Sequence, residues 1–435
     1  MMDNWTKIPL GKLGSTYSGL SGKSKEDFGN GAPYITYTNI FSNGKVNPNM
    51  VDFVKVGKTE KQNKVKYGDI LFTTSSETLE EVGMTSVLLD DLGEIYLNSF
   101  CFGFRLHDFE TLLPEFAAYL LRSKKVRHQI SFNGQGSTRY NLSKGQLLKN
   151  VVLNIPPKDE QLTIAKFLSS LDENIDTIKA LIIKDERIKT GLMQDLLLKG
   201  IDKNGEIRSE ETHEFKNSPI GIIPVEWKYF PLSKKANLLG GCAFKSKDFV
   251  ENGIQLIRMG NLYENELRLD RSPVFLPKHF KKEYKKYHIK SGDIIMSMTG
   301  TYGKRDYGFA ILIENGDFLL NQRLCKFIFD KTEIDTNFLL YLLKSEYYLD
   351  ELFKSVTGSK QGNLKNSNIL NVIVGFPEKD EQLRIVSVMK QQDENIDALK
   401  KDLQKLQRIK TGLMQDLLTG KVSVDALMKH SASTL

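Results

Sequence analysis

The sequence contains an internal repeat, and this repeat limits what the chain can fold into more strongly than any other feature. Three stretches recur in one register, 221 residues apart and with no gap between the matches. They are Asp159–Leu162 with Asp380–Leu383, Asp172–Asp176 with Asp393–Asp397, and Arg187–Leu197 with Arg408–Leu418. Agreement of this length excludes coincidence, so the chain must consist of two copies of one structural module.

The remainder of each copy aligns more loosely, at offsets of 221 to 224 residues. The matched positions are Trp5 with Trp227, Asn39 with Asn261, Gly68-Asp69-Ile70 with Gly292-Asp293-Ile294, Leu97-Asn98 with Leu320-Asn321, Tyr119 with Tyr341, and Asn141-Leu142 with Asn363-Leu364. Each copy therefore has a divergent domain, residues 1–157 or 227–377, followed by a nearly identical segment, residues 158–200 or 378–420. The identical segments must do one task twice, whereas the divergent domains must do two different tasks.

The nearly identical segments are predicted to be long helices. Their apolar side chains recur at alternating steps of four and three residues, which is the heptad spacing of a coiled coil. These positions, one of them a glutamine, are Ile164, Leu168, Leu171, Ile175, Ile178 and Ile182 in the first copy and Ile385, Met389, Gln392, Ile396, Leu399, Leu403 and Leu406 in the second. A single stripe of this kind is ordinarily the buried face of one helix. Two matching stripes, separated by a whole domain, favour mutual pairing as an antiparallel coiled coil.

A second apolar cluster lies toward the end of each predicted helix. Its members are Leu192, Met193, Leu196 and Leu197 in the first copy and Leu413, Met414, Leu417 and Leu418 in the second. We expect this cluster to offer hydrophobic surface on which another protein docks.

The divergent domains are predicted to mix strands with helices, which assigns the chain to the α+β class. Short β-branched and aromatic runs predict strands at Pro33–Thr38 and Asp69–Thr74. Helices are expected at Pro114–Ser131 and, at the matching place in the second copy, Thr336–Lys354. The expected architecture is two pseudo-symmetric mixed α/β domains joined by the two long helices.

Two polar segments lie outside these elements. Residues 201–226 contain several glycines and prolines, which predicts a linker between the copies. Residues 421–435 become small and polar toward their end and are expected to form a frayed tail.

Composition indicates a cytoplasmic protein. No stretch approaches the roughly 18 apolar residues that span a bilayer, and the first residues lack the order of a signal peptide. The three cysteines, Cys101, Cys242 and Cys325, are scattered and odd in number, as expected for reduced thiols. Lysine and arginine outnumber the acidic residues by 61 to 54, a net charge of +7 that favours a polyanionic partner if it is concentrated on one face.

Two runs of lysines precede the Gly-Asp-Ile turns, at equivalent places in the two copies. They comprise Lys55, Lys58, Lys61, Lys64 and Lys66 in the first copy and Lys278, Lys281, Lys282, Lys285, Lys286 and Lys290 in the second. Spaced lysines attract phosphates without regard to sequence. A solvated helix face explains one such run equally well, but recurrence in two diverged domains favours double-stranded DNA as the partner.

Polar loops that contain glycine are the candidates for reading bases, because they supply hydrogen-bonding groups on backbone that can approach a ligand closely. One pair of loops follows the Gly-Asp-Ile turns, and the other precedes Asn141 and Asn363. The candidate residues are Ser75, Ser76, Gln135, Ser137, Thr138 and Arg139 in the first copy and Thr299, Tyr302, Lys304, Arg305, Ser359, Lys360 and Gln361 in the second. Each loop alone is weak evidence, since such loops are common on protein surfaces.

The sequence shows no catalytic or metal-binding motif. Gly22-Lys23-Ser24 resembles the end of a phosphate-binding loop, but Tyr17 stands where the first glycine is needed. Asn154-Ile155-Pro156-Pro157 departs from the adenine-methyltransferase motif, because an isoleucine interrupts it and no aromatic residue follows. The histidines and cysteines lack zinc spacing, and His279 and His288 are predicted to be surface residues. We therefore expect a non-catalytic chain without a metal or cofactor of its own.

The whole pattern resembles the specificity subunits of type I restriction-modification systems. The most specific parts of the resemblance are Pro157–Leu162, which opens a helix, its copy Glu378–Leu383, and the repeated Gly-Leu-Met-Gln-Asp-Leu-Leu that begins at Gly191 and Gly412. Ile220–Trp227, at the entry to the second domain, is also typical of these subunits.

The resemblance implies two target-recognition domains, each reading one half of a split DNA sequence, with an antiparallel helical spacer that sets the gap. Two modification subunits would dock on the helices and methylate adenine from S-adenosylmethionine. Restriction subunits, with ATP and Mg2+, would join this core, so that all cofactors belong to partner subunits. No membrane partner is implied.

Two other classes of function stay open at this stage. One is an enzyme, a nuclease or methyltransferase with an unrecognised motif, which methyl transfer or cleavage by the purified chain alone would reveal. The other is a non-catalytic coiled-coil adaptor that carries two binding domains for other targets. Loss of DNA binding on addition of salt, at constant DNA sequence, distinguishes DNA reading from the adaptor function.

Overall fold

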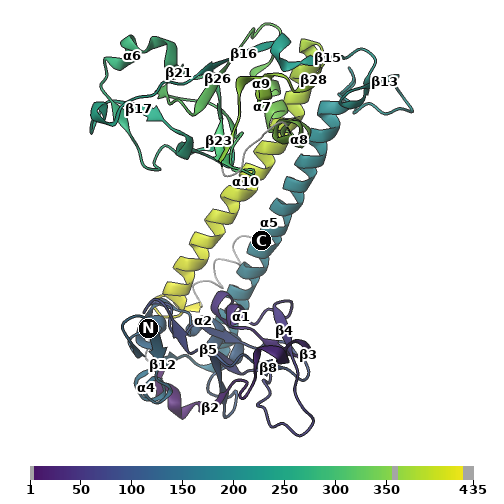
Figure 1. Ribbon diagram of the computed structural model, residues 1–435. Helices are drawn as coiled ribbons and strands as arrows, with labels where there is room; N and C mark the ends of the chain where they lie inside the picture. Colours follow the sequence, from purple (N-terminus) through teal and green to yellow (C-terminus); the bar gives the residue numbers. More distant parts are fainter. Residues whose placement is uncertain (1–3, 355–360, 425–435) are drawn as a thin grey trace. The chain divides into compact units, whose positions relative to one another are not determined.

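The computed structural model of the chain describes residues 4–354 and 361–424 and divides into two compact units. Unit 1 is formed from residues 1–180 and 401–435, and unit 2 from residues 181–400. Each unit thus combines one divergent domain with the beginning of one repeated helix and the end of the other (Figure 1). Both units mix helices with strands, which confirms the predicted α+β class.

Unit 1 is organised around a four-stranded antiparallel sheet. Its strands lie in the order β2 (Gly14–Ser18), β9 (Cys101–Leu106), β5 (Ile70–Thr73) and β7 (Thr85–Val87). Phe72 and Phe102 stack across neighbouring strands, with ring centroids 5.0 Å apart, inside the main core of the unit. The smaller sheets are β4 (Val51–Val54), β3 (Phe28–Ile35) and β8 (Tyr96–Leu97); β10 (Gly134–Gln135), β11 (Tyr140–Leu142) and β6 (Ser75–Ser76); and β1 (Thr6–Pro9) with β12 (Val152–Ile155).

Unit 2 repeats this plan. Its central antiparallel sheet has the order β16 (Ala236–Gly240), β26 (Leu324–Phe329), β22 (Ile294–Ser297) and β24 (Ala310–Leu312). The smaller sheets are β20 (Phe275–Leu276), β17 (Ile254–Ile257), β25 (Asp317–Leu320) and β21 (His288–Lys290); β23 (Thr299–Thr301) with β27 (Gln361–Asn363); β18 (Leu262–Tyr263) with β19 (Glu266–Leu267); β15 (Lys228–Pro231) with β28 (Ile373–Phe376); and β13 (Phe215–Ser218) with β14 (Gly221–Pro224). The repeat seen in the sequence is therefore a repeat of strand order.

Each helix predicted in the divergent domains is in fact two helices. Pro114–Ser131 divides into α2 (Pro114–Leu120) and α3 (Lys124–Ser131), and Thr336–Lys354 into α7 (Thr336–Lys344) and α8 (Glu346–Lys354). The single-helix prediction was wrong because a serine, Ser123 or Ser345, interrupts the chain. Its hydroxyl accepts a hydrogen bond from the backbone N–H three residues later and so caps the second helix.

The strand predicted at Pro33–Thr38 is shorter than expected, whereas the one at Asp69–Thr74 is present as β5. β3 ends at Ile35 because Thr36 caps α1 (Tyr37–Ser42), accepting a hydrogen bond of 3.1 Å from the Asn39 N–H. The remaining short helices are α4 (Lys144–Asn150) in unit 1 and α6 (Phe280–Glu283) and α9 (Asn366–Leu370) in unit 2.

Residues 201–226, predicted as a linker, are folded into unit 2. They contain the hairpin β13–β14, and Ile201, Arg208 and Ile223 are buried. Most of their other side chains are exposed, which explains the polar composition. Of the predicted tail, residues 425–435 lie outside the described residues, and Val424 packs in the core of unit 1.

The two repeated helices are α5 (Lys158–Leu198) and α10 (Lys379–Leu417). Their predicted heptad positions include the buried side chains Ile164, Leu168, Ile175, Ile182, Ile385, Met389 and Ile396. Leu417 shares the core of unit 1 with Ile164, and Leu196 shares the core of unit 2 with Ile385. The end of one helix thus packs beside the beginning of the other, which confirms antiparallel pairing within each unit. None of the described helices is apolar over a stretch long enough to cross a membrane.

Candidate nucleic-acid interface

The two loops predicted to read bases lie side by side in unit 1. β6, which follows the Gly-Asp-Ile turn, pairs antiparallel with β11, and Ser75 lies opposite Asn141. A backbone hydrogen bond of 2.8 Å from the Leu142 N–H to the Thr74 carbonyl extends the pairing. Residues 136–139 join β10 to β11 in the same small sheet.

Unit 2 forms the same arrangement from different side chains. β23 pairs antiparallel with β27, Thr299 lies opposite Asn363, and the Leu364 N–H donates to the Met298 carbonyl at 2.8 Å. These positions are the repeat counterparts of those in unit 1. We term residues 74–78 and 134–142 the polar edge of unit 1, and residues 298–305 and 361–364 the polar edge of unit 2.

Only part of each polar edge is open to solvent. Ser75, Ser76 and Thr299 are buried, so their hydroxyls are not accessible to a ligand as large as a duplex. The exposed candidates are Gln135, Ser137, Thr138, Arg139, Tyr302, Lys304 and Arg305. Arg305 already pairs with Asp350 at 2.5 Å. Contact between the exposed side chains and bases stays a prediction.

The predicted residues at the end of the second polar edge fall partly outside the described chain. Ser359 and Lys360 are not among the described residues. The backbone of Gln361 pairs with Thr301 in the β23–β27 ladder.

An arginine that the sequence did not single out shapes the surroundings of the first polar edge. Arg127 on α3 donates to the carbonyls of Glu80, Val82 and Gly83. Burial lowers the pKa of Arg127 to about 10, so the group keeps its charge at neutral pH. A basic side chain bound to three carbonyls fixes the loop that follows β6. A contact between one side chain and distant backbone carbonyls cannot be predicted from a sequence pattern.

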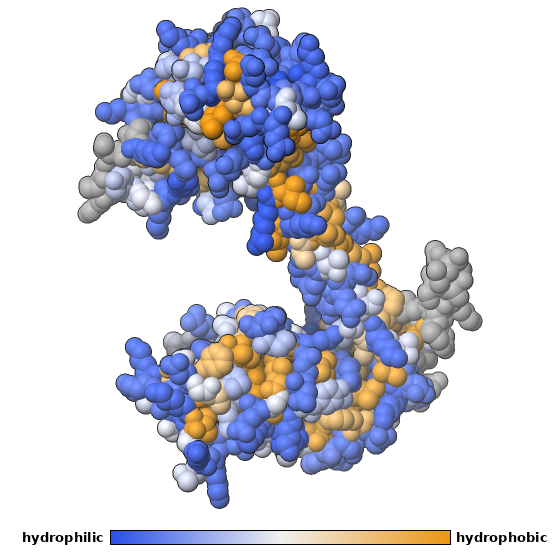
Figure 2. Space-filling model, turned by 90° about the vertical axis from the view of Figure 1, so that its right-hand side faces the viewer, coloured by the Kyte–Doolittle hydropathy of each residue, from blue (hydrophilic) through white to orange (hydrophobic). Residues whose placement is uncertain are grey.

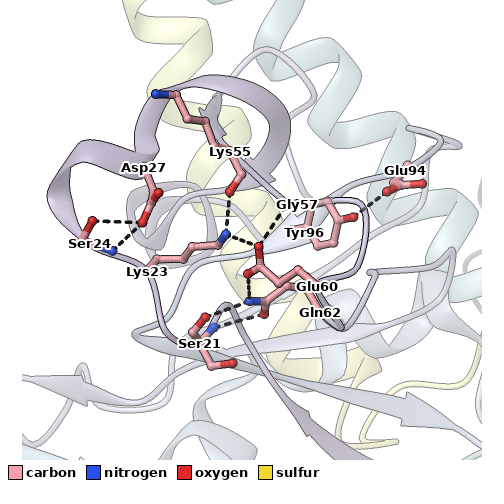
Figure 3. Close-up of polar contacts among 10 residues, drawn as sticks. All are labelled: Ser21, Lys23, Ser24, Asp27, Lys55, Gly57, Glu60, Gln62, Glu94 and Tyr96. Carbon is pink, nitrogen blue, oxygen red and sulfur yellow. Dashed lines mark hydrogen bonds and ion pairs between the residues drawn. The ribbon is translucent and has the colours of Figure 1, made fainter.

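The first lysine run lies on a loop that Lys23 anchors. The Lys23 ammonium pairs with Glu60 at 2.6 Å and donates to the Lys55 carbonyl at 2.5 Å (Figure 3). The Glu60 carboxylate also accepts hydrogen bonds from the Gly57 N–H and the Gln62 amide. These hydrogen bonds, of which the one from Lys23 has the largest effect, lower the pKa of Glu60 to about 2. Lys23, which resembled a phosphate-binding lysine, therefore has a structural role.

The anchored loop exposes lysines to solvent. Lys55, Lys58 and Lys61 are exposed, and no carboxylate of the described residues pairs with any of them. Lys64 differs, because its ammonium pairs with Glu94 at 2.6 Å. Lys66, which follows the loop, is also exposed and has no carboxylate partner among the described residues, so four of the five predicted lysines are available for phosphates.

The second lysine run occupies α6, the 3-10 turn Lys285–Tyr287 and β21. Lys281 pairs with Asp317 at 2.7 Å, and the half-buried His288 contacts the same carboxylate at 3.0 Å. The exposed members for which the described residues offer no carboxylate partner are Lys278, Lys282, Lys285, Lys286 and Lys290. Both runs fit phosphate contact as well as an ordinary solvated surface.

The aspartate of each Gly-Asp-Ile turn is structural. Asp69 and Asp293 each accept a hydrogen bond from the backbone N–H three residues earlier, at 2.8 and 2.9 Å. Arg105 balances the charge of Asp69 at 2.6 Å, whereas Lys326 lies 3.3 Å from Asp293. The motif recurs because both units need this turn before their central strand.

The repeated Asp-Glu-Gln-Leu motif fastens each helix to its domain. Gln161 accepts a hydrogen bond of 2.9 Å from the Leu113 N–H and donates to the Thr111 and Pro156 carbonyls at 3.0 and 2.9 Å. Gln382 makes the same three bonds in unit 2, at 2.8, 3.1 and 3.0 Å. Both glutamines are 1% exposed, so each amide satisfies backbone groups that water cannot reach.

The glutamate of the same motif binds a tryptophan in each unit. The Trp5 indole donates to Glu160 and the Trp227 indole to Glu381, both at 3.2 Å. In unit 2 the carboxylate also pairs with Arg208, and this ion pair is almost fully enclosed. Arg208 thus ties residues 201–226 to the start of α10, while Ile201 and Ile223 pack in the core of unit 2.

A tyrosine, an aspartate and a lysine join each domain to both helices. They are Tyr119 of α2, Asp172 of α5 and Lys410 of α10 in unit 1, and Tyr341 of α7, Asp393 of α10 and Lys189 of α5 in unit 2. The hydroxyl donates to one carboxylate oxygen, at 2.7 Å in unit 1 and 2.6 Å in unit 2, and the lysine pairs with the other oxygen. Burial and the neighbouring carboxylate raise the pKa of both tyrosines.

The apolar cluster predicted as a docking surface is used inside the chain. Four of its members are buried, namely Leu196, Leu197, Leu417 and Leu418. The other four pack against the unit cores: Leu192, Met193, Leu413 and Met414. The prediction of exposed surface was wrong for the four buried leucines, because the end of each helix completes the core beside the beginning of the other helix. Docking of a partner on the four half-buried members stays a prediction.

The helices expose a different apolar set, and it also recurs. Ile188 and its counterpart Ile409 are 46% and 40% exposed, and Leu162 and its counterpart Leu383 are 40% and 47% exposed. Figure 2 shows hydrophobic residues reaching the surface along the helices. Each unit thus presents one leucine and one isoleucine of this recurring set, and α5 in unit 2 also exposes Leu181 and Ile183.

Two of the three cysteine thiols are held in their unreactive, protonated form. Cys101 and Cys325 are buried, and burial raises their pKa, which keeps both protonated at neutral pH. Among residues 4–354 and 361–424, no three His, Cys, Asp or Glu side chains gather in a way that could hold a metal ion.

Known proteins resemble the chain over nearly its whole length. The family model described as the type I restriction modification DNA specificity domain matches residues 2–186 and again residues 224–409. The specificity subunit of the type I restriction enzyme MjaVIII from Methanocaldococcus jannaschii is 31% identical over 311 residues, covering 71% of each chain.

Solved structures show the same fold. A chain from a study of complex assembly in a type I restriction-modification system superposes with a TM-score of 0.59, covering 96% of this chain and 98% of that one at 16% identity. The type I S subunit from M. genitalium gives a TM-score of 0.53, covering 95% and 96% at 18% identity. At such identities the similarity concerns the fold alone.

Proposed function

Because the chain belongs to the type I restriction-modification specificity subunits, whose role is DNA sequence recognition, we propose that each unit reads one half of a bipartite DNA target. The chain itself is not catalytic in this proposal. Unit 1 contacts one half-site through its polar edge and lysine loop, and unit 2 contacts the other half-site through the equivalent residues.

The observation that supports this proposal most strongly is the paired polar edge. Both units keep the same backbone register, with Ser75 opposite Asn141 and Thr299 opposite Asn363, yet apart from these two asparagines most exposed side chains of the polar edges differ. Base reading requires such a combination, because a fixed backbone sets the docking geometry while the side chains choose the base. The exposed lysines of the two runs would add affinity that does not depend on sequence.

The repeated helices set the gap between the half-sites and dock two modification subunits. The exposed Leu162 and Ile409 of unit 1, with Leu383 and Ile188 of unit 2, are the docking residues in this proposal. Their recurrence fits one kind of partner that binds twice. S-adenosylmethionine, ATP and Mg2+ then belong to the modification and restriction subunits.

Genome-wide adenine methylation provides the direct test. It is compared in cells that contain the chain with its modification partner and in cells from which the chain alone is deleted. Loss of one bipartite methylated motif supports the proposal and identifies the target. An unchanged methylome, while the modification subunit is present and folded, contradicts it.

A second experiment tests the role of the helices. Seven residues, about two helical turns, are inserted after Leu181 and, to keep the pairing of α5 with α10, after Lys400. The expected result is a longer gap between unchanged half-sites. Changed half-site sequences would mean that the helices do more than set spacing.

A further inference from the structure

A hollow of about 370 Å³ in unit 2 is lined by three arginines that the sequence pattern did not reveal. Arg258 follows β17, Arg271 lies in the loop after β19, and Arg323 precedes β26. Arg258 donates to the Ser272 carbonyl at 2.7 Å, and the Arg271 guanidinium lies 5.5 Å from the Tyr263 ring centroid. These contacts orient the two groups and use only part of the five N–H donors that each guanidinium carries.

A buried asparagine builds the wall of this hollow. Asn261 is 2% exposed, and its amide donates to the Arg268 and Arg271 carbonyls at 2.9 Å each. Its oxygen accepts a hydrogen bond of 2.9 Å from the Arg258 N–H. The counterpart Asn39 is buried in unit 1 and bonds the backbone of its own loop. The loop is therefore a preorganised part of the fold in both units.

The positive charge of the hollow is not neutralised within the described chain. There, none of the three lining arginines forms an ion pair, whereas Arg268 in the same loop pairs with Glu266 at 2.6 Å. The positive charges around the hollow repel one another, and a negatively charged acceptor group that enters the hollow would relieve this repulsion. Guanidinium forks fit phosphate oxygens and the O6 and N7 atoms of guanine.

Arg323 occupies the place in unit 2 that Phe100 occupies in unit 1. Each accepts a backbone hydrogen bond of 3.0 Å from the polar edge, Phe100 from the Thr74 N–H and Arg323 from the Met298 N–H. Phe100 is 61% exposed. One backbone position beside the polar edge therefore carries a hydrogen-bond donor in one unit and an exposed aromatic ring in the other.

We propose that this hollow receives the DNA of the half-site that unit 2 reads, and that Arg323 donates to a guanine in the major groove while Arg258 and Arg271 contact phosphates. The inference rests on the proposed function and names a specificity-determining residue for it. Arg323 is the base-reading member because, of the three arginines, it is the one whose backbone is hydrogen-bonded to the polar edge. Arg258 and Arg271 are tethered to the loop, as phosphate contacts that set orientation would be.

The test uses the full-length chain in complex with its modification subunits and a pool of randomised duplexes. The unaltered chain is expected to prefer one G·C pair in the second half-site by roughly 5- to 150-fold. Arg323→Ala should remove this preference and leave the preferred sequence of the first half-site unchanged. Arg323→Lys keeps the charge but not the planar fork, so it loses that preference while retaining affinity for unrelated DNA. Arg271→Ala weakens binding to all sequences and lowers the salt slope by about one.

Arg268→Ala is the matched control, because this arginine lies in the same loop but is already paired; it is expected to change neither affinity nor preference. If Arg323→Ala leaves every base preference intact while the unaltered chain selects a bipartite sequence, the inference fails and the proposed function stands. Equal loss on all sequences also overturns the base-reading role. If the unaltered complex selects no sequence, the proposed function fails. If Arg323→Ala does not fold, the base preference of Arg323→Lys is measured instead, and an unchanged preference would contradict the inference.

Discussion

Two regions of the molecule differ in how far the two units agree. One is the junction where each domain meets the helices, and the other is the polar edge. At the junction, the same residue types make the same contacts in both units, as Gln161 and Gln382 do with three hydrogen bonds each. At the polar edge the backbone pairing and the Asn-Leu pairs at 141–142 and 363–364 are common, but most other side chains differ, and Phe100 in unit 1 stands where Arg323 stands in unit 2.

The difference follows from where the polar groups lie. A buried amide that satisfies backbone groups cannot change without leaving a donor or acceptor unpaired, which costs about 1–3 kcal/mol each time. An exposed side chain on a paired strand can change with little effect on stability. One scaffold can therefore keep its junctions constant while its two edges diverge to bind different ligands.

The largest effect is expected from breaking the Arg208–Glu381 ion pair of unit 2. Glu381→Ala leaves the enclosed Arg208 guanidinium without its counter-ion, which should lower the free energy of unfolding by about 3–5 kcal/mol. Denaturant unfolding measures this loss. Asp397→Ala, at an exposed position of the same helix, should cost no more than about 0.5 kcal/mol. A small loss at Glu381 would mean that the pair contributes no more than a surface ion pair does.

The next effect tests whether the two junctions are energetically equal. Gln161→Ala and Gln382→Ala should each lower the free energy of unfolding by about 1–3 kcal/mol, because each leaves buried backbone groups unsatisfied. Methionine at either position keeps the volume but not the hydrogen bonds, so the methionine variants should lose nearly as much. A cost at only one glutamine would show that the repeated contact does not have a repeated role.

Much of the fold could be predicted, because periodic and repeated features depend on local sequence. The heptad spacing through Ile164 and Ile385 predicted both long helices and their antiparallel pairing. The breaks at Ser123 and Ser345 were missed, since apolar residues continue on both sides of a single capping serine. The docking cluster around Leu196 was misjudged because sequence does not show which apolar surface the chain covers itself.

The candidate site was less predictable, because its residues are brought together by strand pairing across long distances in the sequence. The two polar loops were each recognised, but their pairing through Ser75 and Asn141 was not. Arg258 and Arg323 are isolated in the sequence and meet only in the folded unit. Residue type also failed to show that Ser75 and Thr299 are buried.

A smaller effect separates paired from unpaired lysines within one run. Replacing Lys282 and Lys285 with alanine should weaken binding to all DNA sequences and lower the salt slope by about 0.9 for each phosphate that the chain no longer neutralises. Lys281→Ala should do less, since Asp317 already pairs with its ammonium. Binding titrations at several salt concentrations measure both. A change in the preferred sequence at intact affinity would contradict the phosphate role.

The smallest effect concerns how the lysine loop of unit 1 is held, in contrast to the run on α6 of unit 2. The Lys23–Glu60 pair depresses the pKa of Glu60 from 4.5 to about 2. The pairing therefore stabilises the loop fully above pH 4.5, and this stabilisation is lost as the pH falls through about 2. Glu60→Gln should loosen residues 55–62 at neutral pH, seen as lower amide protection, and should match the unaltered chain near pH 2. Amides of α4 serve as the internal reference, because no ion pair among the described residues involves residues 144–150. Equal protection of the loop at neutral pH in both proteins would mean that Lys23 does not hold it, and that the loop is ordered by its backbone alone.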